Sequence, residues 1–186
     1  MEDVLVYWFN GDKRRERDIW FYKKYDKEIE EKFRTKLEWF KGHLEANLEV
    51  LLINNNIKDC VGAIILVDQM AKNIYRNTSK AYEYQDEIAE FAKTVLERLI
   101  KIDDKYLSFI LICIMHQENL ENKELVDLGL FLFNSDKYAA KMQKSMKAHY
   151  NVLEKFGRYP KRNIALGRIT TEQEQKYLDE CGKKFV

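Results

Sequence analysis

The sequence predicts an all-α protein, a single-domain helical bundle covering residues 1–186. Apolar residues recur at spacings of three and four along several long segments, which is the period of an amphipathic helix. Two further segments are apolar nearly all round, as expected of helices enclosed by other helices. Turn-forming residues are scarce, because the chain has seven glycines and one proline. Sheets with tight turns need more of both residues.

Three segments are predicted to form the long amphipathic helices. Residues 24–41, 80–101 and 137–156 each place apolar side chains on one stripe of an otherwise charged helix. In the first of these segments the stripe consists of Tyr25, Ile29, Phe33, Leu37 and Phe40. Helices of this kind bury the apolar stripe against a common core and leave the charged face in water.

The middle of the bundle is predicted to contain the two segments that are apolar on every side. They are residues 59–76 (DCVGAIILVDQMAKNIYR) and residues 105–118 (KYLSFILICIMHQE). A short final helix is expected over residues 171–181, because Thr171 and Glu174 have the spacing of a capping box. No linker, low-complexity tract or second core interrupts this pattern.

Composition argues against several classes of protein. The 32 basic and 31 acidic residues leave a formal charge of +1, whereas a protein that grips a nucleic-acid backbone usually carries a clear basic excess. No nucleic-acid partner is therefore expected. No stretch is long and apolar enough to cross a bilayer, and the opening MEDVLVYWF is not a signal peptide. We expect a cytoplasmic protein without a membrane association.

The three cysteines, Cys60, Cys113 and Cys181, are far apart in the sequence. Two of them lie in apolar runs, which is typical of free buried thiols in a reducing compartment. No cofactor motif is complete: there is no phosphate-binding loop of the P-loop type, no HExxH, and no nucleophile beside an obvious base. No cofactor or metal is predicted.

A first group of unexpected polar residues lies in the buried segment 59–76. Gln69, Asn73 and Arg76 share one helix face, and Asp68 is one position aside. A buried charge without a partner costs several kcal/mol, roughly, so these groups either form ion pairs or face a cavity. The first alternative is an ion pair that fixes helix packing, and the second is a helix face that lines a polar pocket.

Two histidines and a glutamate form a second group. His116 and Glu118 follow the apolar run 109–115, and on a helix they would diverge by about 200°. Both can therefore serve one site only if the helix ends there. His149 lies on the apolar stripe of its own helix, where a hydrogen-bonded core histidine is the alternative to a catalytic one.

The third group is the densest, in the loop FGRYPKRNIALGR at residues 156–168. Pro160 disfavours helical geometry at the residue before it, and the two glycines permit positive φ. The loop would present Arg158, Lys161, Arg162, Asn163 and Arg168. Guanidinium groups suit carboxylates and phosphates because they offer paired donors in fixed geometry. Alternatively, the arginines clamp Asp68, Glu118 and helix C-termini.

Three stretches taken together resemble a known bacterial family, domain of unknown function 924. They are VDQMAKNIYRNTSKAY (67–82), IMHQENLENKE (114–124) and HYNVLEKFGRYPKRNIALGRITTEQEQKYL (149–178). The aromatic residues at 6–9 and 20–21 also match, so the resemblance covers nearly the whole chain. It implies antiparallel helix hairpins similar to tetratricopeptide repeats (TPR-like), and it implies no established activity. The polar positions that match are Asp68, Gln69, Asn73, Arg76, His116, Glu118, His149, Arg158, Arg162, Asn163 and Arg168.

The chain departs from the family pattern at three positions. Lys72 stands where an arginine is usual, which keeps the positive charge. Gln117 replaces a serine after the histidine. Lys161 replaces a histidine after the proline, which removes a group that could transfer protons in that loop.

The leading hypothesis is that the three groups converge on one pocket that binds, and could act on, a small anionic ligand. Arg76, Arg158, Arg162 and Arg168 would hold a carboxylate or phosphate, and Gln69, Asn73 and Asn163 would orient it. His116 and His149 would transfer protons, because histidine titrates near neutral pH. Asp68 or Glu118 would hold a histidine tautomer.

Two alternatives to this hypothesis are open. A TPR-like scaffold would bind a protein partner without catalysis. Its docking surface would be the aromatic segment with Tyr7, Trp8, Phe9, Trp20 and Phe21, unless that segment packs in the core. A metal site would use His116, Glu118, His149 and Asp68, although their spacing matches no recognised metal motif.

Overall fold

The computed structural model describes residues 1–9, 23–98 and 102–181, apart from the side chain of Cys181. Within these ranges every regular element is helical and there is no strand, which confirms the all-α fold class. The α-helices are α1 (Glu2–Phe9), α3 (Asp26–Gly42), α4 (Leu44–Asn54), α5 (Ile57–Ile64), α6 (Ala71–Ile74), α7 (Gln85–Glu97), α8 (Asp104–His116), α9 (Asn122–Gly129), α10 (Asp136–Phe156) and α11 (Glu172–Cys181). A π-helical segment, η2 (Ile65–Met70), joins α5 to α6, and the short 3₁₀ turns are η1 (Lys23–Tyr25), η3 (Ser79–Tyr82), η4 (Leu130–Leu132) and η5 (Pro160–Arg162).

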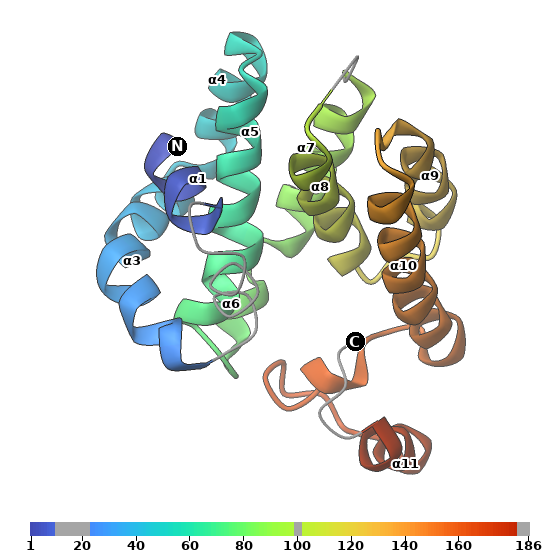
Figure 1. Cartoon of the computed structure of the whole chain (residues 1–186). Helices are drawn as coiled ribbons and strands as arrows, with labels where there is room; N and C mark the ends of the chain where they lie inside the picture. Colours follow the sequence, from blue (N-terminus) through green and yellow to red (C-terminus); the bar gives the residue numbers. More distant parts are fainter. Residues whose placement is uncertain (10–22, 99–101, 182–186) are drawn as a thin grey trace.

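The helices stand side by side in neighbouring pairs (Figure 1). Helix α5 contacts α1 and α4 on one side and α7 and α8 on the other. Helix α7 packs along α8, and α8 in turn contacts α9 and α10. Helix α11 stands apart at the lower end of Figure 1 and contacts η5. Neighbouring antiparallel pairs of this kind fit a TPR-like arrangement.

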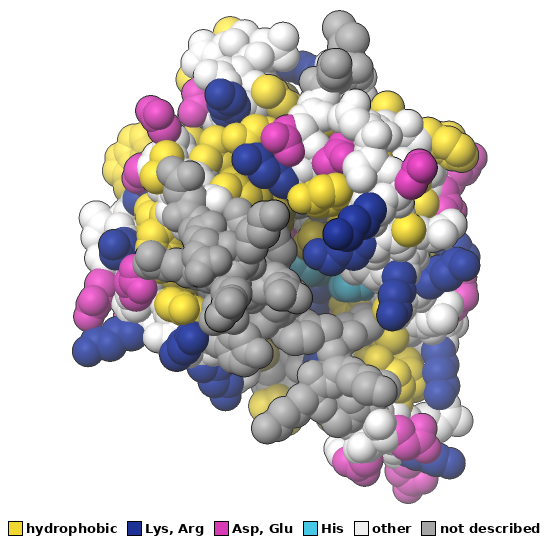
Figure 2. All heavy atoms as spheres, viewed as in Figure 1, with side chains coloured by type: hydrophobic (Ala, Val, Ile, Leu, Met, Phe, Trp, Pro, Cys, Tyr) yellow, Lys and Arg dark blue, Asp and Glu magenta, His cyan; other side chains and the backbone are white. Residues whose placement is uncertain are grey.

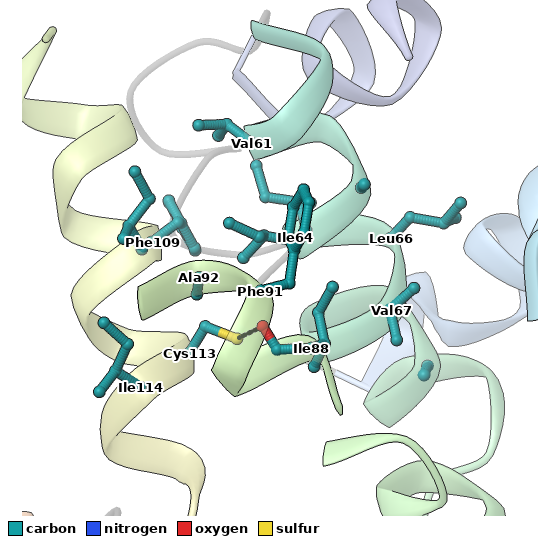
Figure 3. Packing of buried hydrophobic residues seen from close by; sticks show 14 of the residues in the cluster. Val61, Ile64, Leu66, Val67, Ile88, Phe91, Ala92, Phe109, Cys113 and Ile114 are labelled. Carbon is teal, nitrogen blue, oxygen red and sulfur yellow. Dashed lines mark hydrogen bonds between the residues drawn. The ribbon is translucent and has the colours of Figure 1, made fainter. Parts of the chain in front are cut away.

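The core lies between α5, α7 and α8 (Figure 3). Ile64 of α5, Phe91 of α7 and Phe109 of α8 are all buried in one apolar cluster. Cys113 lies in this cluster, and its thiol donates a hydrogen bond to the carbonyl oxygen of Ile88 at 3.6 Å. Cys113 and Cys60 are free and buried, as expected from their apolar surroundings. Burial raises the pKa of the Cys60 thiol to about 11.

Four of the predicted helices agree with the structure to within a few residues. Residues 24–41 and 137–156 correspond to α3 and α10, residues 105–118 correspond to α8, and residues 59–76 correspond to α5, η2 and α6. The predicted helix over residues 80–101 begins later, because η3 is a separate 3₁₀ turn and α7 starts at Gln85. The break turns Tyr82 and Gln85 toward Lys72 of α6. Helices α1, α4 and α9 were not predicted.

The predicted capping box at the start of α11 is present in the structure. The backbone N–H of Glu174 donates to Oγ1 of Thr171 at 3.2 Å, and the carboxylate of Glu174 accepts the backbone N–H of Thr171 at 2.7 Å. The preceding helix α10 ends at Gly157, whose φ of 68° is the left-handed conformation common after a helix C-terminus. The loop between α10 and α11 is therefore fixed at both ends.

The aromatic residues of α1 pack against the core. Trp8 is 1% exposed and meets Phe109 edge to face, with ring centroids 6.0 Å apart. The rings of Tyr7 and Phe9 contact Phe33 and Tyr106. These three side chains therefore form N-terminal core packing rather than a docking patch, whereas Trp20 and Phe21 lie outside the described residues. In the described part of the chain, no helix combines the length and the apolar character needed to span a bilayer.

Candidate functional site

Asp68 is a carboxylate at the centre of the molecule. It lies in the π-helical segment η2 and is 1% exposed. A π-helical turn inserts an extra residue into the helix and re-aims the side chains around it, and such turns occur often at functional sites. Here the insertion falls in the middle of an apolar helix, at the one residue of η2 that carries a charge.

Three side chains neutralise or orient the Asp68 carboxylate. Nδ1 of His116 lies 2.8 Å and 2.9 Å from its two oxygens. The Lys72 ammonium donates to the same carboxylate and also to the backbone carbonyl of Asp68 at 2.7 Å. Lys72 gives its remaining hydrogen to Oε1 of Gln85 at 2.8 Å, and Gln69 donates its amide to Asp68. All three hydrogens of Lys72 are therefore used inside the protein.

The surroundings set the charge of Asp68 and His116. Burial on its own would raise the pKa of Asp68, but His116 and Lys72 outweigh it and hold that pKa well below its usual range. Burial lowers the pKa of His116 to about 4, against the attraction of Asp68. At neutral pH Asp68 is therefore ionised and the His116 imidazole is neutral. Because a carboxylate can only accept, the imidazole hydrogen is on Nδ1, which leaves Nε2 with a lone pair.

His149 of α10 lies beside His116 and has the same tautomer. The two ring centroids are 5.8 Å apart. Nδ1 of His149 donates to the backbone carbonyl of Ser145 at 2.8 Å, so its Nε2 also carries a lone pair. Burial, with a smaller contribution from the charge of Arg162, lowers the pKa of His149. Among the described residues, neither Nε2 atom has a hydrogen-bond partner.

Arg162 of η5 is a second cation of this site, beside Lys72. Its side chain is 8% exposed, and its guanidinium lies 4.9 Å from the ring centroid of Tyr82 and 4.5 Å from that of Tyr159. The Tyr159 ring also meets His149 edge to face at 5.8 Å. No carboxylate of the described residues pairs with Arg162. Burial lowers the pKa of Arg162, although not enough to discharge a guanidinium.

The histidines of this site reach the molecular surface. Figure 2 shows histidine side chains recessed beside lysine and arginine side chains. The side chain of His116 is 17% exposed, while that of Asp68 behind it is fully buried. The arrangement is therefore a carboxylate inside, two imidazoles in front of it, and positive charge around them.

The other predicted arginines do not belong to this site. Arg76 forms a two-point pair with Asp26, at 2.5 Å from Nε and 2.7 Å from Nη2. Asn73 donates to the same carboxylate at 3.0 Å. The prediction that Arg76 and Asn73 share a pocket with Arg162 is thus not matched by their contacts, because Asp26 of α3 engages both. These contacts join the start of α3 to the end of α6.

Arg158 and Asn163 meet in a second cluster, around Glu174 of α11. Arg158 makes a two-point pair with Glu174, with bonds of 2.7 Å and 2.9 Å. Asn163 donates to the same carboxylate at 3.2 Å. The hydrogen bond from Arg158, more than any other contact, lowers the pKa of Glu174 to about 2. We call Arg158, Asn163, Thr171 and Glu174 the C-terminal clamp.

Glu118 holds the loop that carries Arg162. Its carboxylate accepts the backbone N–H of Tyr159 at 2.8 Å and pairs with Arg168 at 2.7 Å. Helix α8 ends at His116, the condition under which the spacing allowed both residues to serve one site. In the structure His116 contacts Asp68, whereas Glu118 contacts Tyr159 and Arg168. Arg168 and Glu118 thus follow the clamping alternative, and Glu118 positions Tyr159 beside His149.

Four residues of the site were not among the predicted site residues, namely Lys72, Tyr82, Gln85 and Tyr159. Lys72 could have been found, because it follows Asp68 by four residues on one helix. Tyr82, Gln85 and Tyr159 gave no signal, since only the fold brings them to Lys72 and Arg162. The Nε2 atom of Gln85 is buried and has no acceptor among the described residues.

The site offers no set of metal ligands among the described residues. In the described ranges, no three histidine, cysteine or carboxylate side chains gather where they could hold a metal ion. The charge of Lys72 acts on His116 and that of Arg162 acts on His149, and both charges repel cations and attract anions.

The known proteins that this chain resembles have no assigned function. Residues 4–182 match the model of a family described as "Bacterial protein of unknown function (DUF924)". No curated protein matches the chain. The solved structure of a protein of unknown function from Agrobacterium tumefaciens is similar, with a TM-score of 0.76 and 24% identity over 96% of both chains. At this identity the similarity concerns the fold.

Proposed function

Because the chain belongs to the family of bacterial proteins of unknown function DUF924, we propose a function from the chemistry of its central site. The protein binds a small anionic ligand, a carboxylate or a phosphate, and acts on it by proton transfer. The observation that carries this proposal is the buried guanidinium of Arg162, which has no carboxylate partner in the described part of the chain.

Burying an unpaired guanidinium is costly, so its retention needs a compensating role. Two aromatic faces offset part of that cost. The nearby carboxylates are engaged elsewhere, since Asp68 is bound by His116 and Lys72 and Glu118 by Arg168. An anion from outside would supply the missing charge, and a buried arginine that binds an anion is a familiar arrangement.

Asp68 and His116 supply the proposed chemistry. Asp68 fixes the hydrogen of His116 on Nδ1, so Nε2 of His116 is the atom that would remove a proton from a bound ligand or from a water molecule. The imidazolium that forms would be stabilised by the ionised Asp68. The broad reaction class is hydrolysis or group transfer on a carboxylated or phosphorylated compound.

Thermal shift across a panel of small carboxylates and phosphates tests the binding step. An anion at one hundred times its dissociation constant stabilises by about 2.7 kcal/mol, which raises Tm by roughly 5–10 °C for a domain of this size. Arg162→Met is expected to abolish the shift. Arg34→Met is the matched control, because Arg34 is exposed and pairs with Glu30 on its own helix. If no anion stabilises the wild-type protein, the proposal is wrong.

A further inference from the structure

We propose that the ligand group bound at this site is a phosphate that carries a hydrogen, rather than a carboxylate or a fully ionised oxyanion. This inference rests on the proposed anion binding and adds the class of anion to it. It follows from which atoms of the site can donate hydrogen bonds and which can only accept them.

Among the described residues of the site, Arg162 is the charged group whose N–H donors are available to a ligand. Its guanidinium carries five N–H groups and pairs with no carboxylate in the described ranges. Lys72 contributes charge but no free hydrogen, because its three hydrogens go to the Asp68 carboxylate, the Asp68 carbonyl and Gln85. One guanidinium can therefore bind two oxygens of an anion in a two-point contact.

The acceptors at the same site are unusual for an anion-binding pocket. Nε2 of His116 and Nε2 of His149 both carry lone pairs, because Asp68 and Ser145 hold the hydrogens on the Nδ1 atoms. The centroids of the two imidazole rings are 5.8 Å apart. His149 and Arg162 both contact the ring of Tyr159. A lone pair that faces an anion is repelled by it unless the anion presents a hydrogen.

Hydrogen phosphate satisfies both requirements. At neutral pH it presents ionised oxygens to Arg162 and at least one P–O–H group that an imidazole nitrogen can accept. Sulfate has the same shape but no hydrogen, and acetate and dimethyl phosphate are ionised without one. The site should therefore favour inorganic phosphate over these three anions.

The charged and titratable groups around the two imidazoles agree with this assignment. Asp68 and Lys72 face His116 from the η2–α6 segment. Arg162 and Tyr159 face His149 from the loop after α10, and Tyr82 covers the other side of Arg162. Each imidazole also faces the other. Among the described residues, Asp68 is the one carboxylate in contact with either ring, and it contacts His116 on the Nδ1 side.

The test is calorimetric titration of the full chain with inorganic phosphate, sulfate, acetate and dimethyl phosphate near neutral pH. Inorganic phosphate is expected to bind at least about tenfold more tightly than the other three anions, the value of one hydrogen bond to a charged group. His116→Asn and His149→Asn each remove one Nε2 acceptor and should reduce this preference. The double variant should erase it while sulfate affinity is kept, which shows that the site is still folded.

His43→Asn is the matched control, because His43 is exposed and its Nδ1 contacts the carbonyl of Trp39, far from the site in the chain. It should leave the phosphate preference unchanged. Equal affinity for phosphate and sulfate in the wild-type protein would overturn the inference and leave the proposed function standing. Binding of acetate without binding of phosphate would also overturn the inference and leave the proposed function standing. Absence of binding by all anions would overturn both.

Discussion

The central site and the C-terminal clamp contain the same kinds of side chain in opposite states. In the clamp, the Glu174 carboxylate accepts hydrogen bonds from the side chains of Arg158 and Asn163 and from the backbone N–H of Thr171. Both charges of the clamp, on Arg158 and Glu174, are therefore paired. In the central site, Asp68 is fully engaged by His116 and Lys72, but Arg162 is buried without a carboxylate among the described residues. The number of arginines in a loop therefore does not identify a ligand site. A ligand site is indicated instead by a buried arginine without a carboxylate partner, here Arg162.

The largest expected effect comes from removing the buried carboxylate of the central site. Asp68→Ala leaves Lys72 charged and without its ion pair in the core. Breaking a buried pair on one side costs about 3–5 kcal/mol, so Tm should fall by roughly 10 °C or more. Chemical denaturation measures the loss in free energy of unfolding. Asp179→Ala, on the exposed face of α11, is the control. A loss no larger than the control's would show that Lys72 does not depend on Asp68.

The two regions should lose stability in different ranges of pH. Burial lowers the pKa of His116 from 6.5 to about 4, so the unfolded chain takes up a proton first and stability falls as pH drops from 6.5 to 4. The pKa of Glu174 is lowered from 4.5 to about 2, so its contribution is complete above pH 4.5 and is lost as pH falls toward 2. The first loss is on the order of 3 kcal/mol.

Variants assign each pH range to its region. His116→Asn should reduce the dependence between pH 6.5 and 4, where the lowered pKa of His149 also contributes, and Glu174→Gln should flatten the range below pH 4.5. Denaturant unfolding at closely spaced pH values gives both slopes. If His116→Asn leaves the upper range unchanged, then the imidazole is not held neutral by the fold.

Removing arginines should change stability with opposite signs in the two regions. Arg162→Met removes an unpaired buried charge and keeps the apolar stem, so the free energy of unfolding should stay equal or rise by about 1 kcal/mol. Arg158→Met takes the partner away from Glu174, so Tm should fall. Both are measured without added anions. A clear loss of stability in Arg162→Met would indicate that this guanidinium is structural.

The smallest expected effect concerns the cap of α11. Thr171→Ala removes the hydroxyl that accepts the N–H of Glu174, at a cost of about 1 kcal/mol or less. Thr171→Ser keeps the hydroxyl and should restore most of the stability. Anion binding at the central site should be unchanged in both variants. If Thr171→Ala weakens anion binding, the two regions are coupled.

Much of the fold could be predicted from the sequence, because the signals are local. The stripes of α3 and α10 and the capping box of Thr171 depend on residues within a few positions of each other. Helix α4 was missed because its apolar residues do not form one clear stripe. The helix predicted over residues 80–101 begins only at Gln85, whose side chain contacts Lys72, 13 positions away in the sequence.

The site could be predicted only in part. The sequence pointed to Asp68, His116, His149 and Arg162, and the structure brings these four together. It could not show that Asp26 and Glu174 would bind Arg76 and Arg158, because those carboxylates are 50 and 16 positions away. Nor does a sequence reveal a π-helical turn at Asp68. Which arginine remains unpaired is a property of the whole fold.

The central claim is that Arg162 is left unpaired in order to hold an anion. A crystal structure of the protein grown with arsenate tests it most directly, because arsenate carries a hydrogen as phosphate does and is located by its anomalous scattering. The account predicts an anomalous peak within hydrogen-bonding distance of the Arg162 guanidinium and of an Nε2 atom of His116 or His149. A peak at Arg158, Arg76 or Arg168 instead, or an Arg162 paired with a carboxylate and no peak beside it, would contradict the account.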